Sequence, residues 1–389
     1  MNDADKHFLQ YLKLHFETDP AAALNQWSLE FEAARRTYNL EYCRRLLQAM
    51  RQWENLSPDN IAQIKNAEGM LYQTLSDWER AKTLHQDAIK LFDAQHNQSG
   101  LASALNNLGL DLIQQSDYST ATEVLEASLI ASEQLQMDEQ IARVCGNLAL
   151  CYRRTERVPE AIQMAERALA LFRKVDNLWE VGRTLFNLGT IHYQQRNYPR
   201  ALEYLDEDRA ICEQFGDTHG LAEIFSNIGL IRYRQGLYIE ADEALVKALR
   251  LFQQLNNLPP QRYVLNNLAL VYEAQNRCEE ALGWYEQVLA LCEELQDHAR
   301  TADVWNNMSE CVGRLRGDDE AVVCFQNAIA IREALGDRVG VNRAGYNQCR
   351  YLTERVLNGA AHLKPVVLPL IEEWLREFHS AAWTIGIQA

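Results

Sequence analysis

The stretch LNNLGLDLIQQ at residues 105–115 returns in altered form at a fixed interval along this chain. It is followed by CGNLALCYRRT at 145–155, LFNLGTIHYQQ at 185–195 and FSNIGLIRYRQ at 225–235, so that the period is 40 residues without a gap. A period of this length is typical of repeat proteins, in which each unit packs only on its neighbours. The sequence therefore predicts a stack of similar units rather than one compact core.

Three positions of the period keep one kind of residue: an asparagine, a small residue two positions later, and an alanine twelve positions after that. Small side chains allow one helix to lie close against the next, and the leucines between them supply a buried face. The pattern therefore predicts antiparallel helix pairs. The asparagine row is Asn107, Asn147, Asn187, Asn227, Asn267, Asn307 and Asn347; the small residues are Gly69, Gly109, Ala149, Gly189, Gly229, Ala269 and Ser309; the alanines run from Ala81 and Ala121 to Ala321 and Ala361.

The N-L-G core, the tyrosines at Tyr118, Tyr198 and Tyr238 and the later alanine resemble the tetratricopeptide repeat, whose usual unit is about 34 residues. The longer unit and endings such as Leu335-Gly336-Asp337 look like the long-repeat subgroup of LGN-type adaptors, kinesin light chains and bacterial Rap and MalT-type regulators. The resemblance covers roughly residues 60–355. It implies an all-α, right-handed superhelical solenoid of antiparallel helix pairs.

The two ends depart from the pattern. We expect residues 1–59 to form a divergent helical cap, with a helix that starts at Pro20 and a second one from Leu40 to Trp53. Seven repeats should fill residues 60–339, and residues 340–389 should hold a degenerate last repeat and a capping helix. Trp374, Phe378 and Trp383 are expected to cover the last repeat; the alternative is a tail that docks on a partner.

Composition limits the function classes. With 38 basic and 54 acidic residues the net charge is -16, which disfavours binding to nucleic acid. No apolar run is long enough to span a membrane, and the polar start is unlike a secretory signal, so we expect a cytoplasmic protein. The nine cysteines include no C-x-x-C pair and fall on apolar helical faces, as packing residues do.

No set of residues typical of an enzyme is present in the sequence. Phosphate-binding glycine loops, H-E-x-x-H and G-x-S-x-G are all missing, and His192 is expected to be a partly buried structural residue. The sequence therefore predicts no catalytic residue, no metal site and no cofactor.

The asparagine row points to binding. In the family that the chain resembles, the first helix of each pair lines a concave groove, and this asparagine can hold the backbone of an extended peptide. An amide suits that role because it both donates and accepts. The alternative is that the asparagines tie one helix to the next, and the sequence leaves both open. In chaperone adaptors a second polar residue three positions later helps to clamp a carboxylate; here Leu110, Leu150 and Thr190 stand there, so this form of capture is not expected.

Specificity should come from neighbours one or two turns from each asparagine. They are basic and aromatic in an acidic chain, although a solvated surface would look the same. We therefore expect a scaffold that binds a protein or peptide partner with acidic and apolar residues. The alternative is a ligand- or peptide-responsive sensor that gates an effector. The predicted groove consists of Asn107, Asn147, Asn187, Asn227, Asn267 and Asn307 with Arg143, Arg154, Arg183, Tyr193, Tyr233, Arg234 and Arg314.

Overall fold

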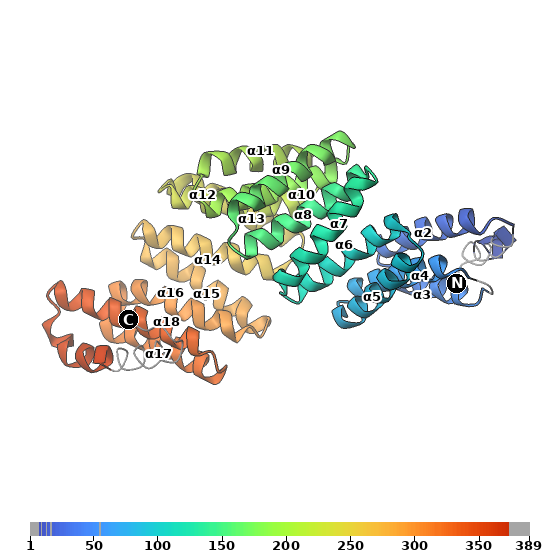
Figure 1. Ribbon diagram of the computed structural model, residues 1–389. Coiled ribbons are helices and arrows are strands. Elements are labelled where there is room, and N and C mark those ends of the chain that lie inside the picture. The colour runs from blue at the N-terminus through green and yellow to red at the C-terminus, as the bar shows by residue number, and fades with distance from the viewer. Residues whose placement is uncertain (1–7, 9, 13, 16–17, 54–55, 373–389) are drawn as a thin grey trace. The chain divides into compact units, whose positions relative to one another are not determined.

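The computed structural model describes residues 8–372 except 9, 13, 16–17 and 54–55, and all regular elements in that part of the chain are helices (Figure 1). A further helical segment covers residues 364–372. Trp374, Phe378 and Trp383 lie outside the described residues. The helices are α2 Pro20–Arg36, α3 Leu40–Arg51, α4 Pro58–Thr74, α5 Trp78–Ala94, α6 Gln98–Gln114, α7 Tyr118–Gln134, α8 Asp138–Arg154, α9 Val158–Lys174, α10 Leu178–Gln194, α11 Tyr198–Phe215, α12 Thr218–Arg234, α13 Tyr238–Gln254, α14 Leu258–Ala274, α15 Cys278–Glu294, α16 His298–Arg316, α17 Asp318–Ala334, α18 Arg338–Leu357 and the short 3-10 helix η1 Ala361–Leu363.

Each period consists of two nearly equal halves. A helix of 17 residues such as α6 ends in a turn whose middle residue has a left-handed backbone, with φ of 62° at Ser116 and 61° at Glu156. The residue after it often caps the next helix: Asp117 accepts a hydrogen bond from the backbone N–H of Thr120 at 3.2 Å. The left-handed residue reverses the chain and the cap starts the next helix, which produces antiparallel pairs.

The small residues of the period lie where two helices of a pair approach most closely. A Cβ atom added to Gly109 would come within 2.5 Å of Leu125 Cδ2, and one added to Gly229 would come within 2.6 Å of Leu245 Cγ. The prediction that this position serves close helix packing is confirmed. The nine cysteines are all buried, as expected for packing residues.

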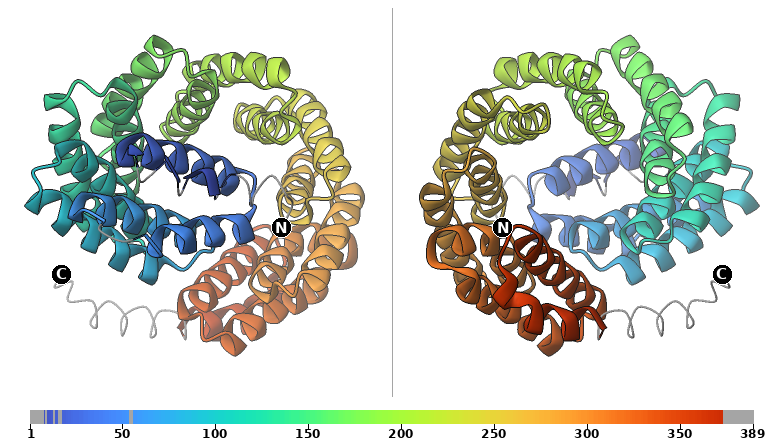
Figure 2. Two further views of the ribbon diagram at one scale, coloured as in Figure 1. Left: turned by 90° about the vertical axis from the view of Figure 1, so that its right-hand side faces the viewer. Right: turned by 90° about the vertical axis from the view of Figure 1, so that its left-hand side faces the viewer.

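The chain divides into unit 1, residues 1–208, and unit 2, residues 209–389, with the division inside α11. Within each unit the helices alternate between two layers (Figure 2). The even-numbered helices are the first members of the pairs, and neighbours among them contact one another, as α4 does with α6 and α6 with α8. The even-numbered helices thus form a continuous face in each unit, which we call the even-helix face.

Both ends of the described chain are packed. Pro20 stands at the first position of α2 with Asp19 as its cap, as predicted, and the indole of the buried Trp27 donates to the carbonyl of Leu46 at 3.0 Å. At the other end Leu363 and Val367 pack on the last helices beside Leu352. No helix in the described ranges is both long and apolar enough to cross a bilayer.

Candidate functional site

The even-helix face carries a cavity in each unit. The unit 1 cavity, of about 610 Å³, is lined mainly by α2, α4, α6, α8 and α10. The unit 2 cavity, of about 330 Å³, is lined by α14, α16 and α18 together with Val288 of α15. Both cavities lie on the first helices of the pairs, where the sequence places the asparagine row.

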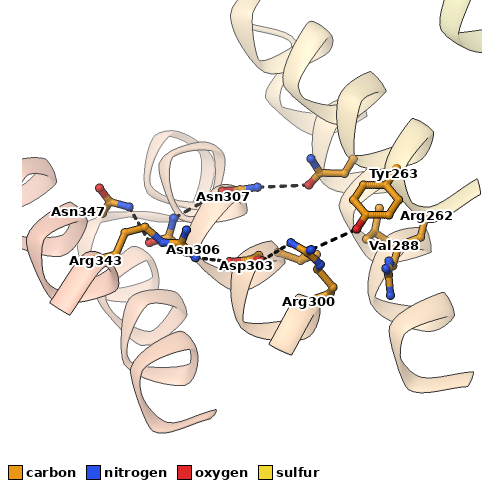
Figure 3. Close-up of a pocket in the computed structure, with 11 residues that line it drawn as sticks. Arg262, Tyr263, Val288, Arg300, Asp303, Asn306, Asn307, Arg343 and Asn347 are labelled. Atoms are coloured by element: carbon orange, nitrogen blue, oxygen red, sulfur yellow. Dashed lines mark hydrogen bonds and ion pairs between the residues drawn. The ribbon is translucent and has the colours of Figure 1, made fainter. Parts of the chain in front are cut away.

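Four asparagines of the row tie neighbouring first helices together. Each donates its side-chain N–H to the side-chain oxygen of an asparagine 41 positions earlier, which is the residue just before the row position of the preceding repeat. We call this contact an asparagine tie. The ties are Asn107 to Asn66 at 3.1 Å and Asn147 to Asn106 at 2.9 Å in unit 1, and Asn307 to Asn266 at 3.2 Å and Asn347 to Asn306 at 3.1 Å in unit 2 (Figure 3).

The other three row residues are not tied. At the acceptor position for Asn187 stands Gly146, and for Asn267 it is Ser226. Among the residues that the structure describes, the side chains of Asn187, Asn227 and Asn267 make no hydrogen bond, and Asn187 is exposed. Their amides are therefore the members of the row that have donors and acceptors to offer to another molecule.

Three arginines meet one carboxylate at the wall of the unit 2 cavity. Nη1 of Arg300 lies 3.1 Å from Oδ2 of Asp303, while Nη2 of Arg332 and Nη2 of Arg343 lie 2.6 and 2.7 Å from Oδ1. Arg332 comes from α17, is only 10% exposed, and also binds Asp337 at 2.7 Å. Arg300 and Arg343 are 47% and 61% exposed. Asp303 thus has one inner arginine and two outer arginines.

The rest of this wall is basic, aromatic and amide-rich (Figure 3). Arg262 is nearly buried and forms an ion pair with Asp297. The ring of Tyr263 lies between Arg262 and Arg300, whose guanidinium carbons are 5.2 and 5.4 Å from its centre, and its hydroxyl accepts from Arg300 at 3.1 Å. The three arginines that line the cavity therefore face a single lining carboxylate, that of Asp303.

The unit 1 cavity contains the predicted residues Arg143 and Arg183. Arg143 pairs with Glu139 at 2.7 Å and Arg183 with Glu180 at 2.6 Å, each with a glutamate of its own helix. Nε of Arg143 is buried and has no hydrogen-bond partner among the described residues. Beside Arg183, the indole of Trp179 is 59% exposed. The charges of Arg143 and Arg183 are thus balanced within their own helices, and the aromatic surface of Trp179 is open to solvent.

The remaining predicted residues lie on the same even-numbered helices, toward their C-terminal ends. Tyr193 and Tyr233 pack on the tyrosines that begin the next helices, with ring centres 6.3 and 6.1 Å apart. Arg234 lies 5.8 Å from the ring centre of Tyr233, and Arg314 donates to Asn276 at 3.0 Å. Arg154 is exposed and, together with burial, lowers the pKa of its neighbour Arg153. None of the residues in this paragraph lines either cavity.

Sequence reasoning missed the residues that organise the unit 2 cavity, namely Asp303, Arg300 and Arg332. One signal was present: Asp303 and Arg343 occupy the same position of successive repeats, one period apart, and carry opposite charges. The contribution of Arg332 had no comparable signal because it comes from the second helix of a pair.

Glu273 on α14 was also missed. Burial raises its pKa to about 7, although the hydroxyl of Tyr285 donates to its Oε2 at 2.9 Å and favours the charged form. Over the described ranges, no group of three or more His, Cys, Asp and Glu side chains is placed to hold a metal ion. His192 is partly buried, as predicted, and stacks on Tyr204 with ring centres 5.5 Å apart.

Comparisons with known proteins agree with the repeat fold. A family model described as tetratricopeptide repeat matches residues 100–174, 180–254 and 261–334, and a second one of the same description matches 227–294. No match is found among curated proteins.

Solved structures similar to this chain are long helical arrays. The apo form of RapI superposes with a TM-score of 0.72 at 16% identity over 92% of this chain and 98% of its own. The apo quorum sensor NprR from B. thuringiensis gives 0.68 at 14% identity over 91% and 99%. A Rap protein complexed with competence and sporulation factor gives 0.59 at 13% identity over 91% and 98%. At these identities the likeness is one of fold.

Proposed function

Because this chain belongs to the tetratricopeptide repeat family, we propose that it binds an extended segment of a protein or peptide partner on its even-helix face. The observation that carries the proposal is the set of untied amides, Asn187, Asn227 and Asn267, on that face. An amide that is not used inside the protein can pair with both the N–H and the C=O of a peptide backbone.

Other side chains of the even-helix face, which line its two cavities, favour a partner with acidic and apolar residues. Trp179 and Tyr263 offer aromatic surface, and exposed aromatic residues next to arginines are typical of binding hot spots. Arg183, Arg300 and Arg343 supply the charges that an acidic residue requires. We propose this chemistry for the groove as a whole, to which Arg143, Arg154 and Arg314 also contribute; the tied Asn107, Asn147 and Asn307 hold its helices together and are not needed as peptide contacts.

A ligand-responsive regulator is the second candidate. One of the similar structures is described as a quorum sensor and another holds the competence and sporulation factor, and the similarity extends over nine tenths of this chain in both. In a regulator the ligand would change the arrangement of the helices and thereby gate an effector. The scaffold and the regulator would bind the same kind of peptide, and they would differ in whether binding changes the arrangement of the helices.

We also propose that the protein acts in the cytoplasm, without catalysis or a cofactor of its own, and does not bind nucleic acid. The net charge of -16 supports the last point, since the phosphate backbone would be repelled.

The test compares untied with tied asparagines. A library of random heptapeptides is passed over immobilised wild-type protein, over Asn227→Ala/Asn267→Ala, whose two untied asparagines both belong to unit 2, and over Asn107→Ala/Asn307→Ala. We expect the first double variant to retain about tenfold less peptide than wild type, since two bidentate amide contacts are lost. The second should retain peptide because its asparagines bond within the protein. Equal retention by wild type and the untied variant would contradict the proposal.

Solution scattering then separates the two candidates. A scaffold should keep its radius of gyration when a retained peptide is added. A regulator should change it.

A further inference from the structure

We infer that Asp303 is an internal counterion that holds the carboxylate-binding arginines of the unit 2 cavity, and that an acidic peptide competes with it for Arg300 and Arg343. This inference rests on the proposed function and names the chemistry of one subsite. It differs from the clamp position at Leu110, Leu150 and Thr190, because the charged residues here lie one or two turns before the row asparagines or on a second helix.

Asp303 forms ion pairs with three arginines, more than one carboxylate can neutralise. Arg300, Arg332 and Arg343 all lie within 3.1 Å of its oxygens. Asp303 and Asp337, which also pairs with Arg332, balance two of the three guanidinium groups, so this cluster keeps one positive charge in excess. An incoming carboxylate would add the missing negative charge.

The two outer arginines are able to move toward a ligand, whereas the inner one is not. Arg343 is 61% exposed and Arg300 is 47% exposed, and both line the cavity. Arg332 is nearly buried and is fixed from the other side by Asp337. If a ligand draws Arg300 and Arg343 away, Asp303 keeps Arg332 and no buried charge is left alone.

The remaining walls fit a short peptide that carries this carboxylate. Tyr263 is 49% exposed and presents its ring beside Arg300, while Val288 and Val304 provide an apolar floor (Figure 3). Arg262 is nearly buried and its charge is balanced by Asp297, so it serves as a fixed part of the wall. Asn307 and Asn347 are held by their ties, whereas the outer arginines are exposed to solvent.

The inference predicts opposite effects of two substitutions in one cluster. Asp303→Asn keeps the size of the side chain and removes its charge, which frees the outer arginines; we expect acidic peptides to bind about threefold more tightly. Arg343→Gln removes one of the two ligand arginines, and binding should weaken about tenfold. Glu354→Gln is the matched control, since it makes the same charge change three turns beyond Arg343 on α18, at an exposed residue that does not line the cavity.

Three defined heptapeptide libraries serve as probes, all without Asp or Glu at their random positions. The first has Asp or Glu at the centre and an amidated C-terminus. The second has Asn or Gln at the centre and an amidated C-terminus. The third has Asn or Gln at the centre and a free C-terminus. Comparing retention of the first and second libraries tests binding of a side-chain carboxylate. Comparing retention of the third and second libraries tests binding of a C-terminal carboxylate. Retention by the full chain is measured for wild type and for each variant, after circular dichroism has confirmed its helix content.

Preference for the first or the third library, raised by Asp303→Asn, lowered by Arg343→Gln and unchanged by Glu354→Gln, is the expected result. Equal retention of all three libraries would overturn the inference and leave the proposed function standing. Retention of none would overturn both. A preference that Asp303→Asn lowers would show that Asp303 supports the site instead of competing for it, and would also overturn the inference.

Discussion

Helix α8 meets its two even-numbered neighbours in different ways. Toward α6 it is tied, because Asn147 donates to the buried Asn106 at 2.9 Å. Helix α8 is not tied to α10, because Gly146 occupies the position of the acceptor. The side chain of Asn187 is therefore left exposed. The same row position is thus used inside the protein at one junction and open to solvent at the next. The comparison teaches that the residue before the row position, and not the row asparagine itself, decides which of the two occurs.

The largest expected effect comes from breaking the tied junction. Asn147→Ala leaves the side chain of Asn106, which is 6% exposed, without its partner, and should lower the free energy of unfolding by about 2 kcal/mol. Asn187→Ala at the untied junction removes an exposed side chain and should change the free energy of unfolding by less than about 0.5 kcal/mol. Urea unfolding followed by circular dichroism measures both. Similar losses for the two variants would show that the tie stabilises nothing.

A smaller, pH-dependent effect is expected at the tied junction between α14 and α16. Burial raises the pKa of Glu273 to about 7 from its ordinary value of 4.5, so the folded state binds this proton more tightly than the unfolded state does. The stability that this proton provides is fully present below about pH 4.5 and is lost as the pH rises through about 7. Glu273→Gln removes this dependence and should be more stable than wild type by about 1–2 kcal/mol at pH 8 and nearly equal to it at pH 4.

The control for this prediction is Glu354→Gln, which neutralises a carboxylate of α18 whose side chain is 56% exposed. Its urea midpoint should follow that of wild type at both pH values. If Glu273→Gln behaves in the same way, the carboxyl of Glu273 is charged in the folded protein, and the junction tolerates that charge.

The sequence was sufficient to predict the stack of helix pairs, but it was not sufficient to predict how the polar residues on the surface of the stack interact. Gly109 and Gly229 could be assigned to close helix packing because a fixed period of small residues has few other causes. Each tie joins residues 41 positions apart, one more than the period, and the period by itself does not predict this offset. The acceptors Asn106 and Asn306 are nevertheless visible in the sequence. The cluster on Asp303 needed coordinates, since Arg332 reaches it from α17. The division at residues 59 and 339 stays a prediction.

The smallest expected effect would create a tie where the chain lacks one. A Cβ atom added at Gly146 has no heavy atom within 4 Å, so Gly146→Asn can present an acceptor to Asn187 as Asn106 does to Asn147. Asparagine also has a higher helix propensity than glycine, so Gly146→Asn can raise the free energy of unfolding without forming a tie. The two contributions must be separated. A double-mutant cycle with Asn187→Ala isolates the pair, and we expect a coupling of about 1 kcal/mol.

Gly146→Ala in the same cycle is the control, because alanine improves the helix but offers no acceptor, and its coupling to Asn187 should be close to zero. The engineered tie should also reduce retention of the random heptapeptide library, since it occupies the amide of Asn187. A stabilising tie with unchanged retention would place peptide binding elsewhere on the even-helix face. A coupling near zero for Gly146→Asn would mean that the helices at this junction are spaced differently from α6 and α8, and that the preceding residue alone does not determine the tie.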